Sequence, residues 1–480
     1  MMLKVLFAAA EAVPFIKTGG LADVIGSLPK ELVKEGVDAR VILPKYSEIP
    51  SHYREMMEPV HILEVPVGWR RQYCGIEKLE LQGITFYFVD NEYYFKRKGL
   101  YGHYDDGERF AYFCRAILEA IPQLGFTPDI LHCHDWHTAA IPVLLAAHYR
   151  QVYPDLRTVL TIHNLQYQGV FAKEVLGDLL GLGHEYFTDD KLEFFGAVNY
   201  MKGGLVFADC LTTVSPTYAE EIQTPYFGEK LDGLLRSRSK DLYGIVNGLD
   251  YDVYNPRLDD FIAVPYTWRS IGRKCKNKMK LQEHVGLPVR AEVPVVAIIS
   301  RLVAAKGLDL VAHVIEELLA SDIQLIVLGT GEERFEGMFR LAAHRYPDKV
   351  SANIFFGEDL AHKIYAGADI FLMPSCFEPC GIGQLIALRY GTLPVARETG
   401  GLKDTVQPYN EYTGEGNGFT FANYNAHDML HTLQRALVFY QQADVWEKII
   451  KNAMRSDYGW HQSAQQYQRL YHQLVAKQEK

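Results

Sequence analysis

Short apolar runs alternate with stretches of helical periodicity at the start of the chain. The runs Lys4–Ala9 and Asp38–Leu43 each predict a buried strand. Between them Gly36 is placed to end a helix whose apolar face is Leu21, Val24, Ile25, Leu28 and Leu32. A strand, a helix and a strand in succession predict a parallel sheet covered by helices.

The alternation continues with two interruptions. The stretch Glu64–Asp90 is rich in β-forming residues and predicts an antiparallel insertion, whereas Tyr243–Pro256 is rich in Gly, Asn, Asp and Pro and predicts a linker. The basic stretch RKCKNKMK after the linker predicts a solvated helix. The remaining expected elements are strand Asp129–His134, helix Trp136–Arg150, strands Thr158–His163, Cys210–Val214, Val293–Ser300, Gln324–Gly329, Asn353–Phe356, Ile370–Met373 and Thr392–Ala396, and a final polar helix, Gln462–Gln478. The pattern therefore predicts two doubly wound α/β halves.

Composition narrows the class of protein. The 480 residues are 48% hydrophobic and 22% charged, which excludes a mainly disordered chain. The net charge of −10 argues against general nucleic-acid binding. The seven cysteines are an odd number and form no C-x-x-C pair, which gives no support to a zinc-ribbon or thioredoxin-like site. We expect a reduced, cytoplasmic compartment. No stretch reaches the roughly 20 apolar residues of a membrane span, and Glu11 interrupts the apolar start, which therefore predicts a strand rather than a signal peptide.

A Thr-Gly-Gly-Leu sequence occurs once in each half. Thr18-Gly19-Gly20 and Thr399-Gly400-Gly401 each open an expected helix, whose first amide groups favour anions. The alternative is that the glycines only allow close packing of helix and strand. Lys17 precedes the first turn and could reach a phosphate or sugar oxygen, although the sequence is not a P-loop.

Charged residues follow two expected strands of the second half. Arg301 and Lys306 come directly after the strand VPVVAIIS, where open α/β sheets bind ligands, and both can hold phosphate. Glu378 follows the strand IFLMPS and could accept sugar hydroxyls or stabilise a positive anomeric carbon. The alternatives are a solvated basic loop for the first pair and a charge at a helix start for Glu378.

The run HCHDWH, His132–His137, has the residue types of a metal site, but the two-residue period of a strand sends its side chains to opposite faces. A strand end leading into a helix fits better, with Asp135 as N-cap or ligand contact. His163 and Asn164 close the next expected strand and could reach the same site.

These motifs together resemble those of bacterial glycogen synthases and plant starch synthases. KTGGLADV, HCHDWH, TIHN, VNGLD, SRLVAAKG and FEPCGIGQ occur in one order from residue 17 to residue 384. The resemblance implies the GT-B fold, two Rossmann-like halves around a cleft. It implies an acceptor-side domain, residues 1–245, a nucleotide-sugar domain, residues 246–455, and a last helix, within residues 456–480, that crosses back to the first. It also implies ADP-glucose as donor, a glycogen or maltooligosaccharide acceptor, and no cofactor or metal.

The resemblance assigns roles to individual residues. It implies that Arg301 and Lys306 bind the diphosphate, that Glu378 and His163 lie beside the donor glucose, and that Asp135 is essential. These five are the expected catalytic residues. The implied substrate-binding residues are Lys17, Gly19, Gly20, Asp23, Asn164, Asn247, Phe356, Cys380, Gly381, Thr399, Gly400 and Gly401.

One position departs from the animal and fungal synthases, which carry a second glutamate where this chain has Ile386. This favours ADP-glucose over UDP-glucose. The resemblance implies a reaction that retains the α configuration. Because no carboxylate in the sequence must be a covalent nucleophile, we expect a same-face, oxocarbenium-like path. The rival functions are a phosphorylase-like enzyme with pyridoxal phosphate, a metal-dependent hydrolase using the HCHDWH cluster, and a non-catalytic glucan-binding or nucleotide-sensing protein.

Overall fold

The computed structural model describes residues 2–476, and the chain forms two compact units. Unit 1 contains the residues up to Gly248 together with those from Trp460 onward, and unit 2 contains Leu249–Gly459. The boundaries expected from the sequence, at 245 and 455, lie a few residues before these two divisions.

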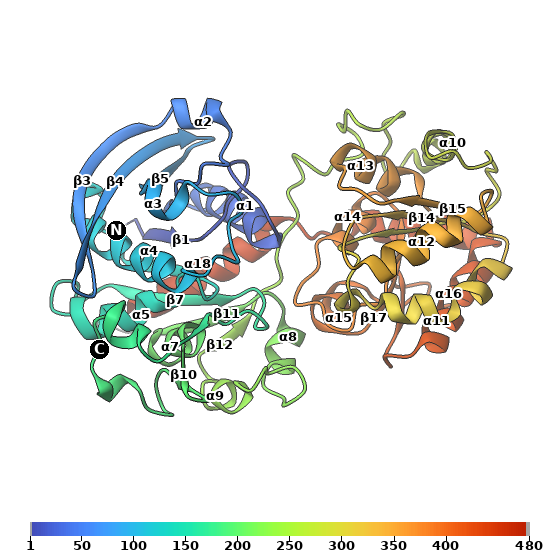
Figure 1. Cartoon of the computed structure of the whole chain (residues 1–480). Coiled ribbons are helices and arrows are strands. Elements are labelled where there is room, and N and C mark those ends of the chain that lie inside the picture. Colours follow the sequence, from blue (N-terminus) through green and yellow to red (C-terminus); the bar gives the residue numbers. More distant parts are fainter. Residues whose placement is uncertain (1, 477–480) are drawn as a thin grey trace. The chain divides into compact units, whose positions relative to one another are not determined.

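Unit 1 is built on a nine-stranded sheet in the order β12-β11-β7-β6-β1-β2-β5-β4-β3 (Figure 1). The strands are β1 (Lys4–Ala8), β2 (Asp38–Pro44), β3 (Glu58–Val67), β4 (Arg70–Leu81), β5 (Ile84–Asp90), β6 (Ile130–His134), β7 (Arg157–Ile162), β11 (Cys210–Thr213) and β12 (Leu242–Gly244). The strands from β12 to β5 run parallel, and β4 joins antiparallel to both β5 and β3. The predicted antiparallel insertion is therefore confirmed as an extension of one sheet edge.

Helices and a small second sheet complete unit 1. The helices are α1 (Gly20–Lys34), α2 (Ser51–Glu55), α3 (Glu92–Phe95), α4 (Asp106–Ala120), α5 (Ala140–Leu144), α6 (Val175–Asp178), α7 (Tyr200–Phe207), α8 (Pro216–Glu221), α9 (Asp232–Ser237) and α18 (Trp460–Ala476). A π-helical turn, Leu145–Tyr149, continues α5, and 3-10 turns span Ile121–Gln123 and His184–Tyr186. The small sheet contains β8 (Val170–Phe171), β9 (Glu193–Phe194) and β10 (Ala197–Asn199).

Unit 2 is built on a parallel six-stranded sheet in the order β15-β14-β13-β16-β17-β18. The strands are β13 (Val295–Ile299), β14 (Gln324–Leu328), β15 (Val350–Asn353), β16 (Ile370–Met373), β17 (Leu393–Arg397) and β18 (Phe419–Phe421). The helices are α10 (Lys274–His284), α11 (Leu308–Ala320), α12 (Glu333–Arg345), α13 (Glu358–Gly367), α14 (Gly383–Arg389), α15 (Gly400–Thr405), α16 (Ala426–Tyr440) and α17 (Ala443–Arg455), with 3-10 turns at Ile271–Arg273 and Ala304–Lys306. The prediction of two α/β halves is confirmed.

The last helix, α18, belongs to unit 1 and packs against α1. Its Tyr471 hydroxyl lies 2.7 Å from Nδ1 of His132, a fully buried residue on β6. The Ser463 hydroxyl donates to the carbonyl of Val246 at 2.6 Å. The helix α18 therefore contacts β6, the strand that contains the first three residues of the HCHDWH sequence.

Three predicted elements are wrong in place or environment. The helix expected from Trp136 begins at Ala140, because residues 136–139 form turns after the strand. The strand expected at Asn353–Phe356 is β15, which ends at Asn353.

The basic helix expected to be solvated is α10, and it is partly buried. Lys274 donates to the carbonyls of Tyr365 and Ala366 and to the Thr392 hydroxyl, and Lys278 pairs with Asp369 at 2.7 Å. Burial lowers the pKa of Lys274 to about 7. These lysines fasten α10 to unit 2, since their partners come from distant parts of the sequence.

Among the described residues, no helix combines the length and the apolar character that crossing a bilayer requires.

Candidate active site

The first Gly-Gly turn of unit 1 is held by a buried glutamate. Oε2 of Glu11 accepts hydrogen bonds from the backbone amide of Thr18 at 2.5 Å and from its hydroxyl at 2.8 Å. Burial raises the pKa of Glu11, against the opposing effect of these donors. Lys17, just before the turn, pairs with Asp23 on α1 at 2.7 Å. Two residues expected to bind substrate, Lys17 and Asp23, therefore bind each other in this structure.

Asp135 and the segment after β7 lie together at the carboxyl ends of two neighbouring strands. Oδ1 of Asp135 accepts from the backbone amides of His163 at 2.8 Å and Asn164 at 3.4 Å. Burial raises the pKa of Asp135 to about 7, although these amides oppose the shift. The expected N-cap role is wrong: α5 begins after Ala139, and Asp135 has a left-handed backbone, φ +56°.

Three histidines of unit 1 lie beside Asp135: His132 and His134 are fully buried, and His163 is half-buried. Nδ1 of His134 lies 2.9 Å from Nε2 of His163, and the ring of His132 lies 4.2 Å from that of His134. Burial lowers the pKa of His163 to about 3. Across the described part of the chain, no three His, Cys, Asp or Glu side chains converge as a metal site requires.

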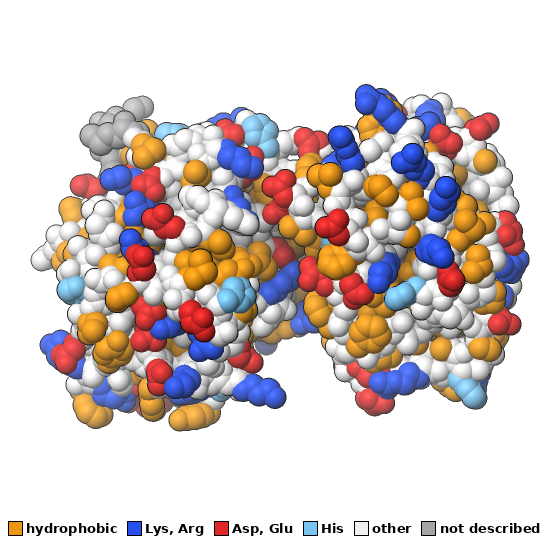
Figure 2. Space-filling model, turned by 90° about the horizontal axis from the view of Figure 1, so that it is seen from above, with side chains coloured by type: hydrophobic (Ala, Val, Ile, Leu, Met, Phe, Trp, Pro, Cys, Tyr) orange, Lys and Arg blue, Asp and Glu red, His pale blue; other side chains and the backbone are white. Residues whose placement is uncertain are grey.

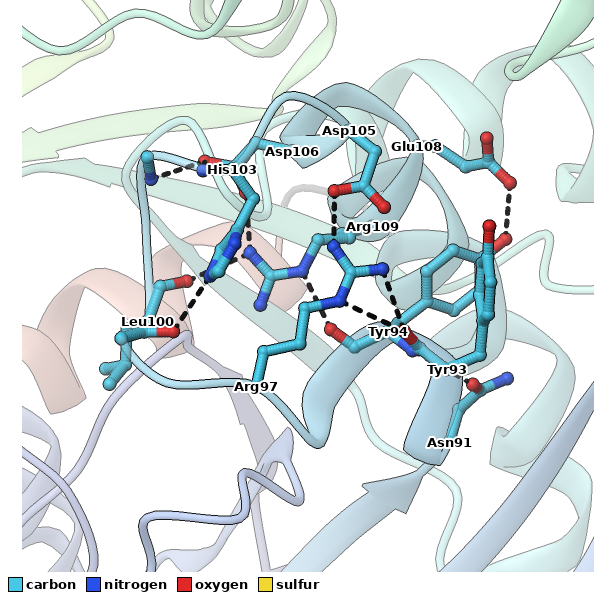
Figure 3. Close-up of polar contacts among 12 residues, drawn as sticks. Asn91, Tyr93, Tyr94, Arg97, Leu100, His103, Asp105, Asp106, Glu108 and Arg109 are labelled. Atoms are coloured by element: carbon cyan, nitrogen blue, oxygen red, sulfur yellow. Dashed lines mark hydrogen bonds and ion pairs between the residues drawn. The ribbon is translucent and has the colours of Figure 1, made fainter.

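A loop after α3 places Tyr101 against the same region. Its ring lies 4.4 Å from that of His137, and burial raises its pKa, with the charges of Glu11 and Asp135 adding to the shift. Figure 3 shows the anchor of this loop: the buried Arg109 guanidinium donates to the carbonyls of Tyr94 and Leu100 and to Asp106. Asp106 in turn accepts from the amides of Gly102 and His103. Arg109 and Asp106 therefore fix the loop on both sides of Tyr101.

The charged residues of unit 2 gather where β13 and β16 end. Nζ of Lys306 lies 2.5 Å from Oε2 of Glu378, and the Ser375 hydroxyl donates to the same oxygen at 3.0 Å. Arg301 is exposed, and no described residue pairs with its guanidinium. Gly307 lets the lysine loop approach β16, because a Cβ there would lie 1.9 Å from the Pro374 carbonyl oxygen. The site thus offers one paired lysine and one unpaired arginine.

The second Gly-Gly turn packs on the loop that carries Glu378. Gly400 has φ +44°, and a Cβ there would lie 2.0 Å from the Glu378 carbonyl oxygen. A Cβ at Gly401 would lie 2.1 Å from the Cys380 carbonyl oxygen, and the Gly401 amide donates to the carbonyls of Glu378 and Pro379. Thr399 precedes α15 and is buried. The alternative considered for these glycines, that they allow close packing, is therefore confirmed for the second Thr-Gly-Gly-Leu sequence.

The remaining expected residues stand in varied surroundings. Phe356 is 88% exposed in the loop after β15. Cys380 is buried, is not part of a disulfide bond, and is followed by Gly381 at φ +77°. Asn247 is buried, and its Oδ1 has no hydrogen-bond partner among the described residues. A buried amide oxygen without a partner is costly, which is consistent with a position that a ligand completes.

Sequence reasoning missed three residues of these groups: Glu11, Tyr101 and Ser375. Glu11 had a usable signal, because a carboxylate interrupts the apolar run directly after the first strand. Tyr101 and Ser375 had none, since each acquires its partners through the fold.

The two doubly wound units, with basic and carboxylate side chains at strand carboxyl ends, define a glycosyltransferase of the GT-B class. A family model described as "Starch synthase catalytic domain" matches residues 4–237, and "Glycosyl transferases group 1" matches residues 280–453. The chain belongs to the glycogen synthase and starch synthase family.

Individual relatives agree. Glycogen synthase of Anoxybacillus flavithermus is 60% identical, covering 99% of this chain and 98% of its own, and that of Desulforamulus reducens is 60% identical, covering 98% and 99%. The solved catalytic domain of starch synthase IV from Arabidopsis thaliana, bound to ADP and acarbose, superposes with a TM-score of 0.92 at 34% identity, covering 99% of this chain and 100% of that one. The predicted fold class, family and enzyme class are confirmed.

Proposed function

We propose that this glycosyltransferase moves glucose from ADP-glucose to the non-reducing end of an α-1,4-glucan, retains the α configuration and releases ADP. The observation that supports it best is the set Arg301, Lys306 and Glu378 at the ends of β13 and β16, in a chain so similar to glycogen synthases. ADP and acarbose, the molecules bound in the related starch synthase, are a nucleoside diphosphate and a saccharide.

The basic pair acts on the leaving group. Arg301 has no partner among the described residues, so its guanidinium is available for the diphosphate, which it can bind through two parallel hydrogen bonds. Lys306 adds a second positive charge, although its ammonium group also forms an ion pair with Glu378. As the bond from the anomeric carbon to the diphosphate breaks, negative charge grows on the phosphate oxygens, and both cations stabilise it.

The carboxylates and the histidine act on the sugar. Glu378 accepts hydrogen bonds from glucose hydroxyls. Asp135 and His163 orient the glucosyl group during a same-face, oxocarbenium-like displacement. Lys17 contacts the nucleotide sugar, and Asn247 supplies its amide oxygen, to which no described residue donates a hydrogen bond. Phe356 stacks on the adenine from its exposed loop.

The setting of the enzyme follows the same reasoning. We place it in the cytoplasm, acting without a metal or organic cofactor on a neutral glucan. Lys and Arg side chains are interspersed with Asp and Glu on the face shown in Figure 2. With a net charge of −10, that distribution supports a small-molecule donor and a glucan rather than nucleic acid.

Incorporation of glucose into glycogen, measured with ADP-glucose and UDP-glucose side by side in the presence of EDTA, tests the proposal. Strong incorporation from ADP-glucose alone is expected. A preference for UDP-glucose would overturn the donor assignment but keep the reaction. Loss of activity in EDTA that zinc or manganese restores would overturn metal independence.

A further inference from the structure

His134, a residue to which the proposed mechanism gives no role, lies directly behind His163. It is the last residue of β6, and His163 follows the end of the neighbouring parallel strand β7. Nδ1 of His134 and Nε2 of His163 are 2.9 Å apart. His134 is fully buried, with its ring stacked on Phe7 at 5.7 Å and tilted against the ring of His132 at 4.2 Å. Its ring orientation is therefore fixed by packing.

A contact of this length between two ring nitrogens needs one proton between them. Both rings are neutral, since burial holds the pKa of each histidine far below its ordinary value. Two arrangements satisfy the contact. In the first, His134 donates from Nδ1, and His163 carries its own proton on Nδ1. In the second, His163 donates from Nε2, and His134 carries its proton on Nε2.

The surroundings of His134 distinguish the two arrangements. Its Nε2 is buried without a hydrogen-bond partner in the part of the chain that the structure describes. The second arrangement would bury an N–H donor with no acceptor, whereas the first leaves only a lone pair unpaired. Buried N–H groups without a partner are the rarer of the two in folded proteins. The first arrangement is therefore the more stable one.

We infer that His134 is a positioning residue that holds His163 in the neutral tautomer with its proton on Nδ1. No described residue hydrogen-bonds Nδ1 of the half-buried His163, so this N–H remains for a ligand. A neutral N–H donor suits an oxygen of the transferred sugar. The functional part of this inference rests on the proposed role of His163, whereas the tautomer is a property of the free protein.

Nitrogen-15 NMR of histidine-labelled protein without substrate tests the tautomer. The signals of His163 are identified by their absence from H163A. The expected pattern is a protonated Nδ1 and an unprotonated Nε2. The reverse pattern, or a doubly protonated ring at pH 7.5, would overturn the inference even if the enzyme is fully active.

A double-mutant cycle tests the positioning role. H134L should lower kcat/KM for ADP-glucose about tenfold or more in the wild-type background, and less than about twofold in the H163A background. H134N, whose amide can replace the Nδ1–H donor, should recover most of the loss. Equal losses in both backgrounds would make His134 merely structural.

His132 provides the matched control. It is equally buried on the same face of β6, but it bonds Tyr471 and the Thr161 hydroxyl instead of His163. H132L should lower the melting temperature and leave kcat/KM within about twofold. If H163A itself leaves kcat/KM unchanged, the proposed role of His163 fails while the tautomer assignment stands on the NMR result.

Discussion

The two units carry the same Thr-Gly-Gly-Leu sequence and hold it in different ways. In unit 1 the turn is tied down by a side chain, since Glu11 accepts both hydrogen bonds of Thr18. Gly19 has an extended backbone, φ −154°, and a Cβ there would meet only Glu11, at 3.8 Å. In unit 2 the turn is pressed against the backbone of the Glu378 loop, with no room for a Cβ at either glycine.

The difference separates two uses of one motif. In unit 2 the glycines are needed for packing, and they fix the loop that carries Glu378. In unit 1 Gly19 leaves space for a Cβ, and the geometry of the turn depends on a buried carboxylate. The Thr-Gly-Gly-Leu sequence therefore predicts a turn in both units, but it does not predict which contacts stabilise that turn.

The largest expected contrast is between G401A and G19A. G401A must displace the Cys380 carbonyl, so we expect glucose transfer to fall at least about a hundredfold and the melting temperature to drop by several degrees. G19A should melt within about 2 °C of the wild type and lose activity only moderately. Transfer assays and thermal unfolding of both variants check this. Equal damage at the two sites would remove the distinction between the turns.

The next contrast lies within unit 2. R301A and K306A should each lower the rate at saturating ADP-glucose by at least about tenfold. Only K306A should also lower the melting temperature, because it leaves the Glu378 carboxylate buried with Ser375 as its remaining hydrogen-bond partner. Steady-state kinetics and thermal unfolding provide the measurements. Near wild-type turnover in R301A would contradict the proposed leaving-group role.

Glu11 provides a smaller test of the turn in unit 1. E11Q replaces charge-assisted hydrogen bonds by neutral ones, so kcat/KM should fall about threefold to tenfold. Asp209 offers a matched control, because its Oδ2 accepts from the amide and hydroxyl of Thr158 in the same pattern. D209N should lower the melting temperature but leave kcat/KM unchanged. Equal kinetic losses in the two variants would mean that the site does not depend on Glu11.

A last effect, measured on stability rather than on activity, is the pH dependence at Asp135. Its pKa is about 7 in the folded protein, above the ordinary value of 3.8, so the unfolded state releases this proton first. Burial of Asp135 therefore does not lower the free energy of unfolding below about pH 4. The loss of stability grows as the pH rises and is complete above about pH 7. The stability of D135N relative to the wild type should rise between pH 5 and pH 8, by about 2–4 kcal/mol at most.

Denaturant unfolding of both proteins at the two pH values checks this prediction. The buried histidines titrate in both proteins, so their contribution cancels in the difference. Parallel pH profiles would show that Asp135 is not destabilised by its burial.

Local patterns were sufficient for most of the fold. The strand Ile370–Met373 was located to the residue, because a short apolar run between polar residues has one interpretation in an α/β chain. The helix expected from Trp136 was wrong because the Asp135 carboxylate bonds amides after the neighbouring strand instead of capping a helix. The solvated helix was wrong because Lys274 and Lys278 meet acceptors about a hundred residues away.

In the candidate site, too, local patterns predicted positions but not long-range contacts. Motifs located the charged residues, but their partnerships depend on which strands become neighbours. The pairing of Lys306 with Glu378 spans 72 residues, and that of His134 with His163 spans 29. Each joins the ends of adjacent parallel strands, which a linear pattern does not specify.

The placement of α18 in unit 1 has a consequence for the order of synthesis. Unit 2 is an uninterrupted stretch of chain, and its two ends pair with each other, the Leu249 amide donating to the Tyr458 carbonyl at 2.7 Å. It can therefore fold as soon as it has left the ribosome. Unit 1 begins first but waits for the helix that places Tyr471 under His132, so the half of the enzyme that is translated first is completed last.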